Sequence, residues 1–174
     1  MNIFRYLALA TVSLVTICAA AQQQANYQIV PLPQSIQQST ISGSYVLKSG
    51  ISISFASGNE DLKYNAEQLS DFLKQEVGFK KVVLAPGKNI KKGIFLQIVP
   101  QADAPEGYTM TVDENGIHVK GNSSTGVFYA IQTLKQSISS ASGETIQMPF
   151  ASIQDAPRFI YRGIMIDVSR HFYS

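Results

Sequence analysis

Residues 106–121 read EGYTMTVDENGIHVKG, and this stretch has the clearest local folding signal in the chain. Apolar and polar side chains alternate on both sides of a central Asp-Glu-Asn-Gly at 113–116. An Asn-Gly pair between two alternating runs is the strongest short-range signal for a β-hairpin. The stretch therefore predicts two paired strands with one buried face. His118 falls on the opposite face, so we interpret it as a surface histidine rather than a catalytic one.

Two helices are predicted, one on each side of this hairpin. Within residues 62–77 the apolar positions recur at intervals of three and four, which places them on one helix face. Ser57 and Glu60 have the spacing of a capping box, and Gly78 stands where such a helix would end. The same periodicity predicts a second helix over residues 127–138. We interpret both helices as parts of the core that have no chemistry of their own.

Five shorter stretches have the composition of strands. Tyr27–Pro33 is interpreted as an opening strand that is ended by its prolines. The others are Tyr45–Leu47, the alternating run Ile51–Phe55, Val82–Leu84 and Ile94–Val99. Strands, helix, strands, hairpin, helix and a last strand follow one another along the chain. This order predicts an α+β fold, in which one sheet has two helices on one of its faces.

Composition excludes several classes of protein. The chain has 174 residues, of which 45% are hydrophobic and 15% charged, and this is typical of a globular protein. Fourteen Lys and Arg against twelve Asp and Glu give a formal net charge of +2. The sequence has no basic stripe, so it does not predict a nucleic-acid partner. One Cys and two His exclude a disulfide framework and do not favour a zinc site. We therefore predict neither a metal nor a cofactor.

The first 21 residues have the pattern of a secretory signal peptide. Arg5 supplies positive charge, residues 7–17 are mostly apolar, and Ala19-Ala20-Ala21 fits the small residues of a cleavage site. Eleven helical residues extend about 16 Å, roughly half of a bilayer core, so the sequence predicts no membrane span. We expect export to the periplasm or the extracellular space. Cys18 offers an alternative, a lipoprotein acylated there, but a bulky residue precedes it.

The C-terminal residues do not fit the domain before them. Residues 153–158 indicate a linker, and residues 159–168, FIYRGIMIDV, indicate a strand. Its continuous apolar centre, Ile164–Ile166, is typical of a strand buried on both faces, as in a parallel sheet. Leaving three such side chains uncovered forgoes about 1.5–3 kcal/mol each. We therefore expect the sequence to be a fragment that ends at the first strand of a second domain.

Residues 155–172, DAPRFIYRGIMIDVSRHF, resemble the start of the catalytic barrel in family 20 glycoside hydrolases, the β-N-acetylhexosaminidases. Upstream, Glu106-Gly107-Tyr108 and residues 126–134, GVFYAIQTL, resemble the accessory domain that precedes that barrel. The most specific feature is an Arg-Gly followed within ten positions by Asp-x-Ser-Arg-His.

This resemblance divides the chain into three parts. Residues 1–21 are expected to be a signal peptide, residues 22–155 an α+β accessory domain, and residues 156–174 the first strand of a truncated catalytic TIM barrel. A complete (β/α)₈ barrel needs about 250 residues, more than the chain contains.

The resemblance also implies an activity. Family members release terminal N-acetylglucosamine or N-acetylgalactosamine from the non-reducing ends of glycans, and they retain anomeric configuration through attack by the substrate's own acetamido oxygen. A Glu protonates the leaving oxygen while a neighbouring Asp holds the acetamido group, and this pair lies well into the barrel. Asp113-Glu114 lies in the predicted hairpin turn, and we do not interpret it as that pair. The fragment alone is therefore expected to have no catalytic residue and no activity.

Arg162 is the single site residue that the resemblance implies. It matches the family arginine that binds the sugar hydroxyls in the −1 subsite, where a planar guanidinium offers paired donors. The alternative is a structural ion pair between Arg162 and an acidic partner. Asp167, Arg170 and His171 lie closer to the end of the predicted strand, and we expect them to support the site through hydrogen bonds.

Two functions from different classes follow. The first is an exported β-N-acetylhexosaminidase, represented by its N-terminal part, whose partners are glycans that contain N-acetylhexosamine. The second is a non-enzymatic exported α+β module that binds a glycan or another partner and shares only the accessory fold.

Overall fold

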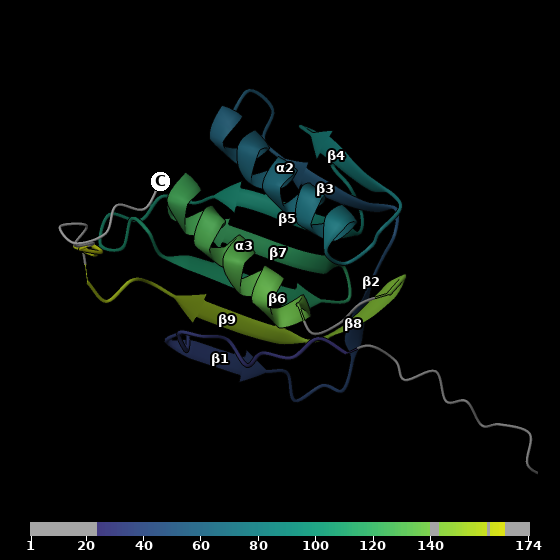
Figure 1. The fold of residues 1–174 in the computed structure, drawn as a ribbon, viewed down its shortest axis with the longest axis horizontal. Helices are drawn as coiled ribbons and strands as arrows, with labels where there is room; N and C mark the ends of the chain where they lie inside the picture. The colour runs from purple at the N-terminus through teal and green to yellow at the C-terminus, as the bar shows by residue number, and fades with distance from the viewer. Residues whose placement is uncertain (1–23, 140–142, 160, 166–174) are drawn as a thin grey trace, which may run out of the picture.

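The structure is a computed structural model that describes residues 24–139, 143–159 and 161–165. Two helices, α2 (Glu60–Gln75) and α3 (Ser124–Ile138), lie side by side on one face of a large sheet (Figure 1). A separate two-stranded sheet pairs β2 (Ser44–Lys48) with β8 (Thr145–Pro149). The strands of the large sheet are β1 (Ser35–Gln38), β3 (Ile51–Phe55), β4 (Val82–Pro86), β5 (Gly93–Ile98), β6 (Tyr108–Asp113), β7 (Gly116–Gly121) and β9 (Ala151–Asp155).

The large sheet is mixed and has the strand order β1-β9-β6-β7-β5-β3-β4. The four strands β4, β3, β5 and β7 are parallel, whereas β6, β9 and β1 continue the sheet with antiparallel pairing. The predicted α+β class, with two helices on one face of a sheet, is confirmed. The prediction of a single sheet is wrong, because β2 and β8 pair only with each other among the described strands.

The core lies between the helices and the sheet. There the apolar face of each helix packs on the apolar face of the sheet. The predicted helices bury the faces that their apolar spacing defines. Strands β3, β6 and β9 bury alternate residues. Burying one such side chain contributes about 1.5–3 kcal/mol, so this layer is the main source of stability. Its fully buried members include Ile53, Leu62, Leu69, Leu96, Met110, Val119, Ile131, Leu134 and Ile153.

The hairpin has the predicted form. β6 and β7 pair antiparallel in the register Val112↔Ile117 and Asp113↔Gly116. Asp113 Oδ1 accepts hydrogen bonds from the backbone N–H groups of Asn115 at 2.7 Å and Gly116 at 3.2 Å, which closes the turn. The Asp in the Asp-Glu-Asn-Gly sequence therefore shapes the turn.

The predicted opening strand is in the wrong place. Residues 25–34 form no strand, and β1 begins at Ser35, after both prolines of the Pro-Leu-Pro sequence. Proline has no backbone N–H to donate to a neighbouring strand, so regular pairing starts only beyond Pro33. Tyr27 and Ile29 are nevertheless buried, and the Tyr27 hydroxyl donates to the Pro149 carbonyl at 2.5 Å.

The predicted linker over residues 153–158 is also partly wrong. Its first three residues belong to β9, which lies between β6 and β1. Ile153 is fully buried and pairs with Met110 of β6 and Ile36 of β1. The alternation of Ala151 and Ile153 covers too few residues to show from sequence alone whether this segment is a strand or a loop.

Helix α2 is capped by a residue other than the predicted one. Asn59 is the N-cap, and its side-chain oxygen accepts from the Leu62 N–H at 2.9 Å. The predicted capping residue, Ser57, is exposed and lies outside the helix. Gly78 has a φ of 88°, and the Phe79 N–H bonds the Leu73 carbonyl, so the predicted helix end is confirmed.

Helix α3 packs directly on backbone at the ends of β6 and β7. A Cβ at Gly126 would overlap the Gly107 carbonyl oxygen, and a Cβ at Gly121 would overlap the Val127 backbone nitrogen. The Asn122 N–H donates to the same Gly107 carbonyl at 2.9 Å. We call Gly107, Gly121 and Gly126 the glycine contact. It fixes where α3 begins relative to the hairpin.

The predicted strand over residues 159–168 is not formed in its described part. Phe159 and residues 161–165 have no regular structure, and Tyr161, Ile164 and Met165 are 90%, 92% and 96% exposed. A strand forms only against a neighbour that accepts its hydrogen bonds, and none of the described strands lies beside it. The start of a barrel therefore stays a prediction.

Several predictions concern residues outside the described ranges. These are the signal peptide over residues 1–21, acylation at Cys18, and the supporting roles of Asp167, Arg170 and His171. Within the described ranges, no helix combines the length and the apolar character that crossing a bilayer requires.

The cap assignment predicts unequal effects for two neighbouring substitutions. Asn59→Ala removes the acceptor of the Leu62 N–H and is expected to lower the free energy of unfolding by about 1 kcal/mol. Ser57→Ala, the matched control, is expected to change it by less than about 0.5 kcal/mol. Urea denaturation of the two variants measures the difference. Equal losses would show that the cap is misassigned.

The glycine contact predicts that alanine destabilises α3 despite its higher helix propensity. Gly126→Ala alone would favour a helix by about 1 kcal/mol, but its methyl group would meet the Gly107 carbonyl. Overpacking against immobile backbone costs about 1–3 kcal/mol, so we expect a net loss of stability. In thermal unfolding, the midpoint temperature of Gly126→Ala should lie below that of wild type. The midpoint of Thr125→Ala, at an exposed neighbouring position, should be close to that of wild type. A stabilised Gly126→Ala would contradict the close packing.

Candidate functional site

The guanidinium of Arg162 is held by groups from two distant parts of the domain. Its Nη2 donates to Glu106 Oε2 at 2.5 Å and to the Tyr129 hydroxyl at 3.1 Å. Its Nη1 donates to the backbone carbonyl of Phe159 at 2.5 Å. The guanidinium carbon also lies 5.9 Å from the centroid of the Tyr129 ring. We call Arg162, Glu106 and Tyr129 the arginine cluster.

The glycine contact brings the partners of Arg162 together. Glu106 directly precedes Gly107, and Tyr129 lies one helical turn after Gly126, so contact between the two glycines places both side chains at the same end of the domain. The hydroxyls of Tyr108 and Thr133 lie 2.5 Å apart in the core and join β6 to α3 one turn further along.

The arginine cluster is open to solvent, and its electrostatics are those of a surface ion pair. The side chains of Arg162 and Glu106 are 43% and 37% exposed. The hydrogen bond with Glu106 is the main cause that raises the pKa of Arg162 above its ordinary value, and the hydrogen bond with Tyr129 adds to it. Arginine is a cation in proteins in any case, and here donors on both terminal nitrogens of Arg162 are already in use.

This geometry matches the second interpretation of Arg162 from the sequence, an ion pair with an acidic partner. Sequence reasoning did not identify Glu106 or Tyr129 as its partners. Both lie within the stretches that resemble the accessory domain, but only the fold shows that these stretches meet the segment after β9. Binding of a sugar by Arg162 stays a prediction.

His118 lies on the sheet face that the hairpin pattern predicted, but it is not freely exposed. Its ring stacks on Phe95 of β5 with a centroid separation of 4.5 Å and an interplanar angle of 1°. Its Nε2 lies 3.4 Å from Asp113 Oδ2. In the described ranges, no group of three or more His, Cys, Asp or Glu could hold a metal ion.

Comparison with known proteins assigns the fold to a family. Residues 26–156 match the family model for domain 2 of glycosyl hydrolase family 20. The chain belongs to this family. A β-hexosaminidase of Porphyromonas gingivalis is 32% identical over 155 residues, covering 84% of this chain and 19% of that protein. A β-hexosaminidase of Vibrio furnissii is 28% identical over 158 residues, covering 88% of this chain and 23% of that protein.

Solved structures of the family have the same fold. The family 20 β-N-acetylhexosaminidase of Streptomyces coelicolor matches with a TM-score of 0.71 at 25% identity, covering 85% of this chain and 30% of that one. An exo-β-N-acetylglucosaminidase of Vibrio harveyi matches with a TM-score of 0.63 at 27% identity, covering 88% and 23%. The chain thus spans less than a third of these relatives, and what it shares with them is the accessory domain.

The arginine cluster predicts unequal cleavage at two neighbouring arginines. Trypsin must take the guanidinium into its own pocket, so pairing with Glu106 should slow cleavage after Arg162 relative to the exposed Arg158. Glu106→Ala is expected to raise the ratio of cleavage after Arg162 to cleavage after Arg158 by up to about fivefold, as befits a half-exposed pair. Timed digestion followed by mass spectrometry measures this ratio.

Glu114→Ala serves as the control for this experiment, because Glu114 is an exposed glutamate in the β6–β7 turn. It should leave the ratio unchanged. A ratio that Glu106→Ala does not alter would show that the arginine cluster does not persist in solution.

Proposed function

We propose that this chain is the N-terminal part of an exported β-N-acetylhexosaminidase, which removes terminal N-acetylglucosamine or N-acetylgalactosamine from the non-reducing ends of glycans. The match of residues 26–156 to domain 2 of glycosyl hydrolase family 20 is the observation that supports the proposal most. The relatives named as β-hexosaminidases in Vibrio furnissii and Porphyromonas gingivalis support the substrate class. Export is supported by the signal-peptide pattern of the first 21 residues.

The proposed reaction is substrate-assisted hydrolysis with retention of configuration. The acetamido oxygen of the substrate attacks the anomeric carbon, a glutamic acid protonates the leaving oxygen, and water then opens the cyclic intermediate. The Asp-Glu pair that this chemistry requires would belong to a barrel beyond Ser174. The 174-residue chain itself would supply the accessory domain and Arg162.

Arg162 would bind two adjacent hydroxyls of the terminal sugar. Its guanidinium has five N–H donors in a fixed plane, and three hydrogen bonds to Glu106, Tyr129 and Phe159 occupy part of that set. To bind two hydroxyls side by side through Nη2 and a neighbouring nitrogen, Arg162 would have to give up its bond to Glu106 or to Tyr129. We propose that packing of this segment into a barrel causes that exchange.

The protein read from the complete gene tests the proposal. It should release the chromophore from an aryl N-acetylglucosaminide, and Arg162→Ala should lower kcat/KM by about tenfold or more, mainly through kcat, because charge-assisted hydrogen bonds to the sugar are lost. Arg158→Ala is the matched control and should retain wild-type activity. Full activity of Arg162→Ala would reject its role as a sugar-binding residue.

The nucleotide sequence after the Ser174 codon separates this proposal from the non-enzymatic alternative. An open frame that encodes a barrel with an Asp-Glu pair would support the enzyme. A stop codon directly after Ser174, together with a stable short protein, would support a binding module.

A further inference from the structure

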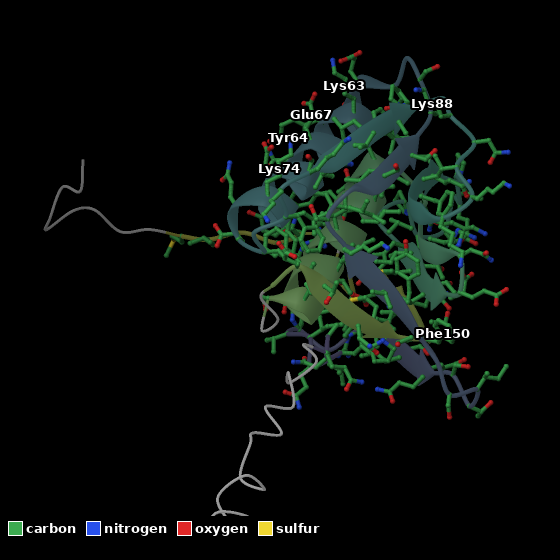
Figure 2. All side chains as sticks on the ribbon, turned by 90° about the vertical axis from the view of Figure 1, so that its right-hand side faces the viewer. Lys63, Tyr64, Glu67, Lys74, Lys88 and Phe150 are labelled. Atoms are coloured by element: carbon green, nitrogen blue, oxygen red, sulfur yellow. The ribbon has the colours of Figure 1, made fainter. Side chains whose placement is uncertain are left out.

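The face of the large sheet opposite α2 and α3 has a chemistry unlike that of the core. Figure 2 shows the labelled α2 residues Lys63, Tyr64, Glu67 and Lys74 on the helix side and Phe150 away from them. On this second face most side chains are polar: they are hydroxyls, amides, the rings of Phe95 and His118, and the charged Asp113 and Lys120. Aliphatic groups occur there at the edge strand β4, in Val83 and Ala85. Across neighbouring strands, the register aligns a single row: Phe95, His118, Thr111, Ser152 and Gln37.

This row, which we call the polar row, runs across five strands. Neighbouring strands are about 4.8 Å apart, so the row extends about 19 Å, longer than one pyranose ring. Hydroxyl and amide groups both donate and accept hydrogen bonds, as Thr111, Ser152 and Gln37 can do here. None of these three side chains is fully buried.

A groove lies along one end of the polar row. It has a volume of about 740 Å³, and its walls are the loop after β1, the β6–β7 turn and Phe150. A second hollow of about 520 Å³ beside β2 shares Phe150 and Glu114 with it. Both volumes fall in the range of small-molecule sites. The ring of Phe150 therefore stands between two hollows, held in place by Gly43, which leaves room for no side chain there.

The charges around the groove select the type of ligand. Among the described residues, no Lys or Arg lines the larger hollow, whereas Asp113 and Glu114 do. Lys48 and Lys92 line the second hollow. The larger hollow therefore offers an anion no cationic side chain among its described residues. Its hydroxyls, amides and carboxylates suit a neutral molecule with many hydroxyl groups, and the ring of Phe150 suits an apolar C–H face of such a molecule.

We propose that the polar row and the groove beside Phe150 bind a neutral oligosaccharide of the N-acetylglucosamine type, laid across β6, β9 and β1. The sugar hydroxyls and acetamido groups pair with Thr111, Ser152 and Gln37, and one ring of the chain stacks on Phe150. The choice of N-acetylglucosamine rests on the proposed function. The binding surface itself rests on the register, the groove and the charges.

Calorimetric titration of the 174-residue chain with a β-linked N-acetylglucosamine hexamer tests the proposal. Wild type should bind at millimolar concentration or below. The double variant Thr111→Val/Ser152→Ala removes two hydroxyls with little change in side-chain size and should weaken binding about tenfold or more. Thr145→Val, at an exposed threonine of β8 outside the groove, is the matched control and should bind as wild type does.

A second measurement guards against variants that merely misfold. Amide chemical shifts of the folded wild-type chain should change on titration around Thr111, Ser152 and Gln37 and not along α2. Phe150→Leu, which keeps an apolar side chain but removes the ring, should also weaken binding. Because Phe150 packs against the core, its binding is measured at a temperature at which the variant is fully folded.

Four results would overturn the proposal. They are no binding by wild type, unchanged binding by the double variant, equal weakening by Thr145→Val, or a dimer that Thr111→Lys dissociates, since the face would then be an interface between copies. Each result is independent of the proposed hydrolysis, because the titration measures binding by a chain without the barrel. Conversely, an inactive full-length protein would leave the titration unaffected.

Discussion

The close packing of α3 on the hairpin backbone determines most of what is specific to this domain. Gly126 lies against the Gly107 carbonyl, at a point where the helix and the ends of β6 and β7 have no side chains between them. Because the contact is between backbones, it cannot be adjusted by rotating side chains. It sets the position of α3 on the sheet, the burial of Ile131 and Leu134, and the location of Tyr129 at the C-terminal edge of the domain.

The parts of the fold that sequence reasoning predicted are those in which neighbours along the chain determine the structure. The hairpin and both helices have periodicities that extend over many residues, and the structure confirms them. β1 and β9 were misplaced because each is short and gains its stability from a distant partner. Choosing Asn59 rather than Ser57 as the N-cap requires the first residue of the helix to be known to within two positions. The sequence pattern alone does not determine the start that closely.

The arginine cluster was beyond sequence reasoning for a similar reason. The motif predicts a sugar-binding role for Arg162, with an ion pair to an acidic partner as the alternative. Identifying that partner as Glu106 requires the position of the segment after β9 relative to α3, which is a property of the folded domain. The polar row likewise exists only in the assembled sheet, since its five members come from five strands.

The pairing of the first strands with the last has a consequence for folding during synthesis. β1 pairs with β9 in a register that places Ile36 opposite Ile153. β2 pairs with β8 in a register that places Leu47 opposite Ile146. As the chain emerges from its N-terminus onward, the parallel strands and α2 can begin to pack while β1 and β2 still have no partner. The pairing of β1 with β9 can form only when residue 155 has emerged. The contacts between residues far apart in the sequence therefore form last. The segment that contains Arg162 emerges directly after this closing step, next to an α3 that is already in place.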